Sequence, residues 1–228
     1  QSQKPGIFSV QEALINQVND LEKGVYKHAG VGRDDGKSAG EFSAIFYDTT
    51  QFTLKAENTF WLSETPEKAG SMGWDAACVR ITTWVKLLDS KSGKSFFVFN
   101  THFDHVGDTA RLESAKLIKL KIDEIAGDNP VILTGDFNCR KGSAPYNVIT
   151  EVKYSLPLSD SRYHSKNQDH EPEFSFVGSN FEGEQGNIID HIFLSHHWKI
   201  NQSGIINNCS NHRCPSDHLP VVAHVELL

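Results

Sequence analysis

Short apolar runs of strand length recur along almost the whole chain, and they constrain its fold more than any other feature. Several runs alternate in polarity or are rich in β-branched and aromatic residues, which is typical of strands. Several adjoin as hairpin candidates rather than as strict strand–helix–strand units, which favours packed sheets with helices outside them and a single domain. The expected strands are Phe42–Asp48, Cys78–Leu88, Ser95–Asn100, Val131–Leu133, Ile188–Leu194 and Leu219–Val225.

Helical spacing of apolar residues occurs in two further segments. Gln11–Glu22 is one, and Thr109–Ile125, with Asp108 as its expected N-cap, is the other. A shorter helix is expected after Ser143, with Pro145 in its first turn. Three irregular stretches are longer than ordinary connections, a property of loops that carry function. These stretches are Gly24–Gly40, Ser63–Asp75 and Ser159–Gly186.

Charge and composition narrow the class of protein. The formal net charge of −7 lowers the expectation of a dedicated binder of duplex nucleic acid, which usually has a basic excess. No apolar run approaches the length of a transmembrane span, so we expect a soluble protein. No signal peptide is visible, but the sequence opens with Gln rather than Met, so the compartment, cytoplasmic or exported, stays open. Cys209 and Cys214 are close enough for a disulfide, although the composition does not require one.

The segment from Pro130 to Asn138 is the most informative for chemistry. An apolar strand leads to a glycine, and Asp136 and Asn138 follow two residues apart. Side chains at i and i+2 of an extended chain point the same way, so both can serve one site. An ordinary turn after a strand is the alternative interpretation.

Polar residues also mark the ends of other expected strands. His102 follows an apolar run, and Asp217 and His218 precede the last strand. Asp190 is an acid among apolar neighbours, which is costly unless it is paired, and this makes it a candidate partner for a histidine. A lone histidine of this kind is more often merely solvated. Together, however, these groups supply the cation-holding carboxylate, the base and the donor that phosphoester hydrolysis needs.

These segments resemble the endonuclease/exonuclease/phosphatase superfamily, whose fold is that of deoxyribonuclease I. The resemblance implies an α+β fold in four layers, α/β/β/α, with two packed mixed β-sheets flanked by helices, and one domain over residues 1–228. Trp61–Pro66 and Gly32–Lys37 resemble a bacterial subgroup of uncharacterised members. The matching motifs stand in the family's order: Val10-Gln11-Glu12, Asn100-Thr101-His102, Gly135-Asp136-Phe137-Asn138, Ile189-Asp190-His191-Ile192 and Ser216-Asp217-His218.

The resemblance implies a role for the first group of matched residues. Glu12, at the start of the first helix, would be the main ligand of Mg²⁺, for which Mn²⁺ could substitute. Asp217 would complete the metal site. Asp136 would position or deprotonate the attacking water, and Asn138 would hold a phosphate oxygen.

A second group would surround the phosphate. His218 would contact it and donate a proton or hydrogen bond, oriented by Asp190. His102 would lie across the phosphate, with Glu41 as its acid partner. Arg33 would contact substrate, although a solvated loop charge is nearly as good an interpretation. The expected partner is a phosphoester, whether a small molecule, lipid-derived or nucleic acid, and the expected state is a monomer.

One feature of the family is missing from the sequence. Members begin with a strand whose Asn serves the metal site, and no such Asn precedes Glu12. We expect that this segment has been omitted; its true loss would favour a catalytically inactive member that binds a partner. A binuclear zinc hydrolase is a further hypothesis, prompted by the histidines at 102 and 105. Its motif needs another histidine where Asn100 stands, so the spacing disfavours it.

Overall fold

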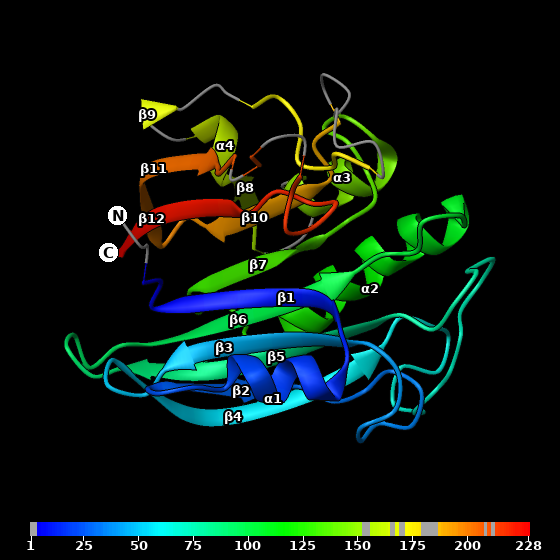
Figure 1. The fold of residues 1–228 in the computed structure, drawn as a ribbon, viewed down its shortest axis with the longest axis horizontal. Helices are drawn as coiled ribbons and strands as arrows, with labels where there is room; N and C mark the ends of the chain where they lie inside the picture. Colours follow the sequence, from blue (N-terminus) through cyan, green and yellow to red (C-terminus); the bar gives the residue numbers. More distant parts are fainter. Residues whose placement is uncertain are drawn as a thin grey trace.

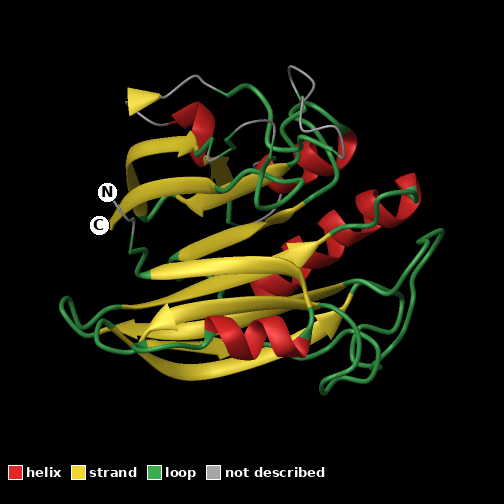
Figure 2. Cartoon of the chain, viewed as in Figure 1, coloured by secondary structure: helices red, strands yellow, loops and turns green. Residues whose placement is uncertain are grey.

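A computed structural model describes residues 4–151, 156–164, 167–168, 172–178, 187–207, 209–210 and 213–228 (Figures 1 and 2). The strands are β1 (Ile7–Ala13), β2 (Tyr26–Ala29), β3 (Phe42–Asp48), β4 (Phe52–Trp61), β5 (Ile81–Asp89), β6 (Ser95–His102), β7 (Val131–Asp136), β8 (Leu158–Asp160), β9 (Asn167–Gln168), β10 (Asp190–Ser195), β11 (Trp198–Ile205) and β12 (Val221–Leu227). The helices are α1 (Ile15–Leu21), α2 (Asp108–Ile125), α3 (Ala144–Thr150) and α4 (Ser161–His164).

Two β-layers pack face to face between helices. One layer is the six-stranded sheet β4-β5-β6-β7-β10-β8, and the other contains the three-stranded sheets β1-β3-β2 and β12-β11-β9. Helix α1 covers the outer face of β1-β3-β2, while α2 packs on the six-stranded sheet (Figures 1 and 2). Both parallel and antiparallel pairs occur in the large sheet. The predicted four-layer α/β/β/α sandwich is confirmed.

Strand β3 shows how the sequence pattern produces the layers. Successive side chains of a strand point to opposite faces. Phe46 therefore packs with Val18 of α1, while its neighbour Ile45 joins the cluster between the two β-layers, which also contains Val85. A third cluster, which includes Phe99, fills the space between the six-stranded sheet and the helices α2 and α3.

Most predicted elements are present with shifted ends. The strand Phe42–Asp48 has the predicted bounds, and a helix follows Ser143 with Pro145 in its first turn. Helix α2 begins at Asp108, so Gly107, and not Asp108, is the N-cap. Strands β4 and β11 were not predicted.

The first helix begins later than predicted. The chain continues β1 to Ala13, with a register shift against β3 between Val10 and Ala13. Glu12 lies in this irregular stretch with a φ of 61°. It therefore belongs to a bulged strand end, and the prediction that placed it at the start of a helix is wrong. Such backbone strain is uncommon outside glycine and concentrates at functional sites.

The long stretches contain more structure than expected. Strand β2 lies within Gly24–Gly40, and β8, α4 and β9 account for part of Ser159–Gly186. Residues 165–166, 169–171 and 179–186 of the latter lie outside the described part of the chain. A disulfide joins Cys209 to Cys214. Among the described residues, no helix has the length and apolar character needed to cross a bilayer.

Candidate active site

Three neighbouring strands of the six-stranded sheet place functional side chains in one row. His102 ends β6 and is in register with Asp136, which ends the parallel strand β7. Asp190 begins the antiparallel strand β10 and is in register with Asp136 from the other side. Paired residues of adjacent strands point to the same face of a sheet. Residues far apart in the sequence are therefore gathered at the same end of these three strands.

Gly135 allows strands β6 and β7 to approach each other closely at this end of the sheet. Its φ is 155°, and a Cβ at this position would lie 2.3 Å from the carbonyl oxygen of Thr101. A larger residue would push β7 away from β6. The glycine before Asp136 thus helps to bring this carboxylate beside His102.

The turn after β7 is held by its own polar groups. The backbone N–H of Asn138 donates to Oδ1 of Asp136 at 2.8 Å. Its side-chain Nδ2 donates to the carbonyl oxygen of Phe103 at 3.0 Å and, more weakly, to Oδ2 of Asp136 at 3.4 Å. Asn138 has a φ of 45°. These bonds stabilise a backbone conformation that a non-glycine residue seldom adopts.

His218 reaches the row from the loop before β12. Its Nδ1 lies 2.8 Å from Oδ2 of Asp190, and its Nε2 lies 3.8 Å from Oδ2 of Asp136. The structure thus brings Asp190 and His218 together as the sequence predicts. On the other side, Nε2 of His102 lies 3.3 Å from Oδ2 of Asp136. The carboxylate of Asp136 is consequently flanked by two imidazoles.

Burial and charge give these groups unusual proton affinities. Burial lowers the pKa of His218, but the hydrogen bond and charge of Asp190, followed by the charges of Asp136 and Asp217, outweigh it and raise that pKa to about 9. Burial, and then the charge of Asp190, raise the pKa of Asp136. Burial, followed by the charge of Arg80, lowers the pKa of His102 well below its usual range. The site thus combines a cationic His218 with a neutral His102 and a carboxyl of raised basicity.

The two residues expected to bind metal lie at the margin of this row. The carboxylate of Glu12 is 59% exposed, and its Oε1 lies 3.9 Å from Nε2 of His102. Asp217 is also exposed. Of the described residues, the three-donor group at this site is Asp136, Asp190 and His218, which includes neither of them.

Glu41 and Arg33 form a pair beside the row. The guanidinium of Arg33 donates to the carboxylate of Glu41, so Glu41 is not the acid that contacts His102. This correction has a simple cause, because a permanent guanidinium cation is a stronger partner for a carboxylate than a neutral imidazole. The carboxylates that approach His102 are those of Asp136 and Glu12. Arg33, Glu41 and Glu12 nevertheless line the same narrow hollow as His102.

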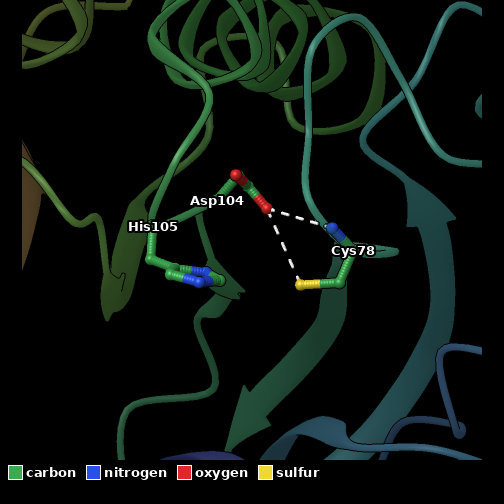
Figure 3. Close-up of side chains that lie close together, drawn as sticks. All are labelled: Cys78, Asp104 and His105. Atoms are coloured by element: carbon green, nitrogen blue, oxygen red, sulfur yellow. Dashed lines mark hydrogen bonds between the residues drawn. The ribbon is translucent and has the colours of Figure 1, made fainter.

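Arg80 also lines that hollow, and sequence reasoning missed it. It is buried, with Nε 3.5 Å from Oδ2 of Asp104, and Nη2 donates to Nδ1 of His105 at 3.0 Å. Figure 3 shows Cys78, Asp104 and His105 together, with the backbone N–H and the thiol of Cys78 directed at Asp104. Because a guanidinium only donates, Nδ1 of His105 accepts and its Nε2 holds the ring proton. This cluster is therefore a hydrogen-bonded network without a free imidazole ligand for metal.

Phe176 is a second residue that the sequence did not single out. Its ring centroid lies 5.0 Å from that of His218. Phe176 and Asn138 both line a cleft of about 760 Å³, whose walls also come from the start of α2, the start of α3 and Asn187. The row of catalytic candidates therefore lies between a narrow, charged hollow and a wider cleft of mixed character.

Comparisons with known proteins agree with this architecture. The model of the Endonuclease/Exonuclease/phosphatase family matches residues 1–218. A solved structure of an endonuclease/exonuclease/phosphatase from Bacteroides vulgatus is 40% identical, with a TM-score of 0.88, and the alignment covers 97% of this chain and 85% of that one. The mannosyl-6-phosphatase of Bacteroides thetaiotaomicron is 34% identical, with a TM-score of 0.87 and the same coverage of 97% and 85%.

The curated relatives are matched over a smaller share of their own length. Nocturnin of Drosophila melanogaster is 27% identical over 218 residues, which cover 81% of this chain and 32% of that protein. The chain spans only 24–36% of the curated relatives that it matches. The human Nocturnin catalytic domain, at 18% identity and a TM-score of 0.73 over 98% of this chain and 81% of its own, shares the fold.

Proposed function

Because this chain belongs to the endonuclease/exonuclease/phosphatase family, we propose that it is a divalent-metal-dependent hydrolase that cleaves a phosphoester by in-line attack of water. The observation that carries the proposal is the position of His218, whose ring nitrogens face the carboxylates of Asp190 and Asp136. A cationic donor and a basic carboxylate thus meet at one point, which suits attack on a phosphoryl group.

Asp136 is the group that we assign to the attacking water. Its raised pKa makes it a better proton acceptor than an ordinary carboxylate. It accepts a proton as the oxygen of water forms a bond to phosphorus. His102, which we expect to be neutral, can donate from Nε2 to a phosphoryl oxygen or to Asp136, which lies 3.3 Å away.

His218 is the group that we assign to the departing oxygen. The ester bond between phosphorus and this oxygen breaks, and the imidazolium supplies the proton that the leaving group requires. Asp190 keeps the ring oriented and charged, acting as a positioning residue. Asn138 would contact a phosphoryl oxygen after giving up its longer hydrogen bond, the 3.4 Å contact with Asp136.

The metal site that we propose is built on carboxylates that face solvent. Mg²⁺ takes oxygen ligands, retains several waters, and is commonly held by one or two carboxylates together with substrate phosphate. Glu12 fits this description, because its carboxylate is 59% exposed beside His102 and sits on strained backbone. We assign Asp217 as a second carboxylate. When bound, Mg²⁺ or Mn²⁺ would neutralise charge on the phosphoryl oxygens.

The substrate class that we favour is a small phosphoester, with the enzyme acting as a monomer. The similarity to a mannosyl-6-phosphatase supports a sugar phosphate. The wide cleft beside Asn138 and Phe176 would receive the part of the substrate attached to phosphorus, and Arg33 would contact it from the other side. The net charge of −7 favours a small substrate over a long nucleic acid.

A panel of esters tests the proposal. Phosphate release from mannose 6-phosphate and p-nitrophenyl phosphate, and cleavage of bis-p-nitrophenyl phosphate, would be measured with Mg²⁺ and with a chelator. We expect metal-dependent hydrolysis that His218→Ala and Asp136→Ala reduce by about 100-fold or more. His224→Ala, on the exposed face of β12, is the matched control. Activity unchanged in both site variants would refute the assigned mechanism.

The two alternative hypotheses give different results in this panel. A catalytically inactive binding member would hydrolyse none of the esters. A zinc hydrolase would require zinc. Asn100, which its motif would need to be histidine, is buried and donates to the carbonyl oxygens of Val10 and Ala44. It therefore links the two β-layers instead of facing the site.

A further inference from the structure

His191 is a buried histidine beside the site that the proposed mechanism does not use. It follows Asp190 on β10, and successive strand residues point to opposite faces. Asp190 consequently faces His218, whereas His191 points into the core and is 2% exposed. In a buried imidazole of this kind, both ring nitrogens need hydrogen-bond partners within the protein.

Each ring nitrogen of His191 faces an oxygen. Nδ1 lies 2.9 Å from Oδ2 of Asp160, and Nε2 lies 3.0 Å from the carbonyl oxygen of Cys139. A neutral imidazole has one N–H, so one of its nitrogens would turn a lone pair towards an oxygen lone pair. That contact would be repulsive in a buried environment. Two protons, one directed at each oxygen, satisfy both contacts.

Asp160 is placed to neutralise such a cation. It is 1% exposed, and besides His191 it receives the hydroxyl of Tyr146 at Oδ2, 3.2 Å away, and the backbone N–H of Arg162 at Oδ1, 3.0 Å away. A buried carboxylate is tolerated when it is paired and hydrogen-bonded in this way. The ring of Phe193 stacks on His191 with centroids 5.3 Å apart, which also favours a cation.

The contact between Nε2 of His191 and Cys139 reaches the turn after β7, which carries Asp136 and Asn138. Cys139 directly follows Asn138, whose φ of 45° must be maintained for its contacts with Asp136. Resting on the proposed function, we infer that His191 is a positioning residue: a buried imidazolium, neutralised by Asp160, that holds the carbonyl of Cys139 and through it the turn from Asp136 to Asn138. The network ties β8, β10 and α3 to this turn.

The protonation state can be tested without any assay of activity. Long-range ¹H–¹⁵N correlation spectra of the metal-free protein at pH 7 distinguish a doubly protonated ring from either neutral tautomer. We expect His191 to show protons on both nitrogens, slow to exchange with solvent. His191→Gln identifies the signals. A neutral ring with a single N–H would overturn the inference, and ¹³C shifts of the Asp160 carboxyl would then show whether Asp160 holds the second proton.

Kinetics test the positioning role. His191→Gln and Asp160→Asn should each lower kcat by roughly 10- to 100-fold with little change in KM, since a small displacement of a catalytic group is costly while ground-state binding is retained. In the double variant the Asn amide can donate to the Gln carbonyl, and the Gln amide to Cys139. We therefore expect the double variant to recover part of the loss in kcat, whereas additive losses in kcat would show that the two side chains do not act together on the turn.

Two controls separate this inference from the proposed function. His224→Gln, exposed on β12, should leave kcat unchanged, and circular dichroism and thermal unfolding establish whether each variant folds. A wild-type protein that hydrolyses none of the esters would refute the proposed function, while the spectra still decide whether His191 is a buried cation. An active protein whose kcat is insensitive to His191→Gln would refute the positioning role alone.

Discussion

Asp190→Asn is the substitution that most directly probes the charge on His218. The pKa of His218 rises from an ordinary value of about 6.5 to about 9, although burial acts against the rise. A shift of this size corresponds to roughly 3 kcal/mol in favour of the charged ring, at 1.36 kcal/mol per unit. Asp190 contributes both the hydrogen bond and the largest charge effect among the groups that raise it.

Removing the charge of Asp190 should therefore bring the pKa of His218 back to about 6.5, because burial then opposes the smaller charge effects of Asp136 and Asp217 that still raise it. At pH 7.5 the charged fraction would fall from nearly all molecules to about one in ten. If the imidazolium supplies the proton to the leaving group, activity at this pH should drop by about tenfold from ionisation alone. The lost orientation of the ring would lower it further.

An NMR titration of His218 in the metal-free protein measures the shift, and kcat at pH 7.5 measures the consequence. Asp217→Asn is a useful comparison, because the charge of Asp217 raises this pKa less than Asp190 or Asp136 does, so its removal should lower the pKa of His218 much less. The raised pKa also stabilises the fold fully below about pH 6.5, and this stability is lost as the pH rises towards 9. A pKa of His218 near 9 in Asp190→Asn would refute the reasoning.

Three further predictions concern stability and metal. Asp104→Asn should cost about 2–4 kcal/mol in urea unfolding at neutral pH, because this buried carboxylate accepts backbone N–H groups. Burial opposes the shift, but these bonds hold the pKa of Asp104 well below its usual range. The contribution of Asp104 to stability should therefore be complete above about pH 3.8 and decline progressively as the pH falls below that value. Equal stability of the variant and the wild type at neutral pH would contradict this prediction. Glu12→Gln should raise the Mg²⁺ concentration for half-maximal activity about tenfold or more without lowering the melting temperature, since the side chain is 59% exposed; an unchanged requirement would exclude Glu12 as the ligand. Reducing the Cys209–Cys214 disulfide should lower the free energy of unfolding by about 2 kcal/mol. The stability of a variant with serine at both positions should not respond to the reductant, and an equal loss in that variant would contradict the prediction.

The position of the site could be predicted because strand ends are visible in the sequence. An apolar run that stops at polar residues indicates where β6 and β7 end, and these strands end at His102 and Asp136. Asp190 could be paired with a histidine because an acid inside an apolar strand needs a partner. The structure brings His218 to it at 2.8 Å.

Other features depend on contacts that no local pattern encodes. The alternation of apolar residues in β4 and β11 is interrupted in the middle of each strand, because residues 55–58 and 201–202 are polar or small and exposed. The backbone of Glu12 is set by the register shift against β3, which pairing decides and residue spacing does not. The predicted partner of Glu41 was wrong because its contact with Arg33 depends on the conformation of the loop that carries Arg33, which the sequence does not reveal.

Hydrolysis in ¹⁸O-labelled water is the measurement that tests the central claim most directly. Wild-type protein and Asp136→Ala would be given Mg²⁺ and whichever ester is cleaved best. We predict that one ¹⁸O atom enters the released phosphate and none enters the alcohol, and that Asp136→Ala loses about 100-fold or more of the rate. Label in the alcohol, or an unchanged rate for Asp136→Ala, would contradict attack of an Asp136-activated water on phosphorus.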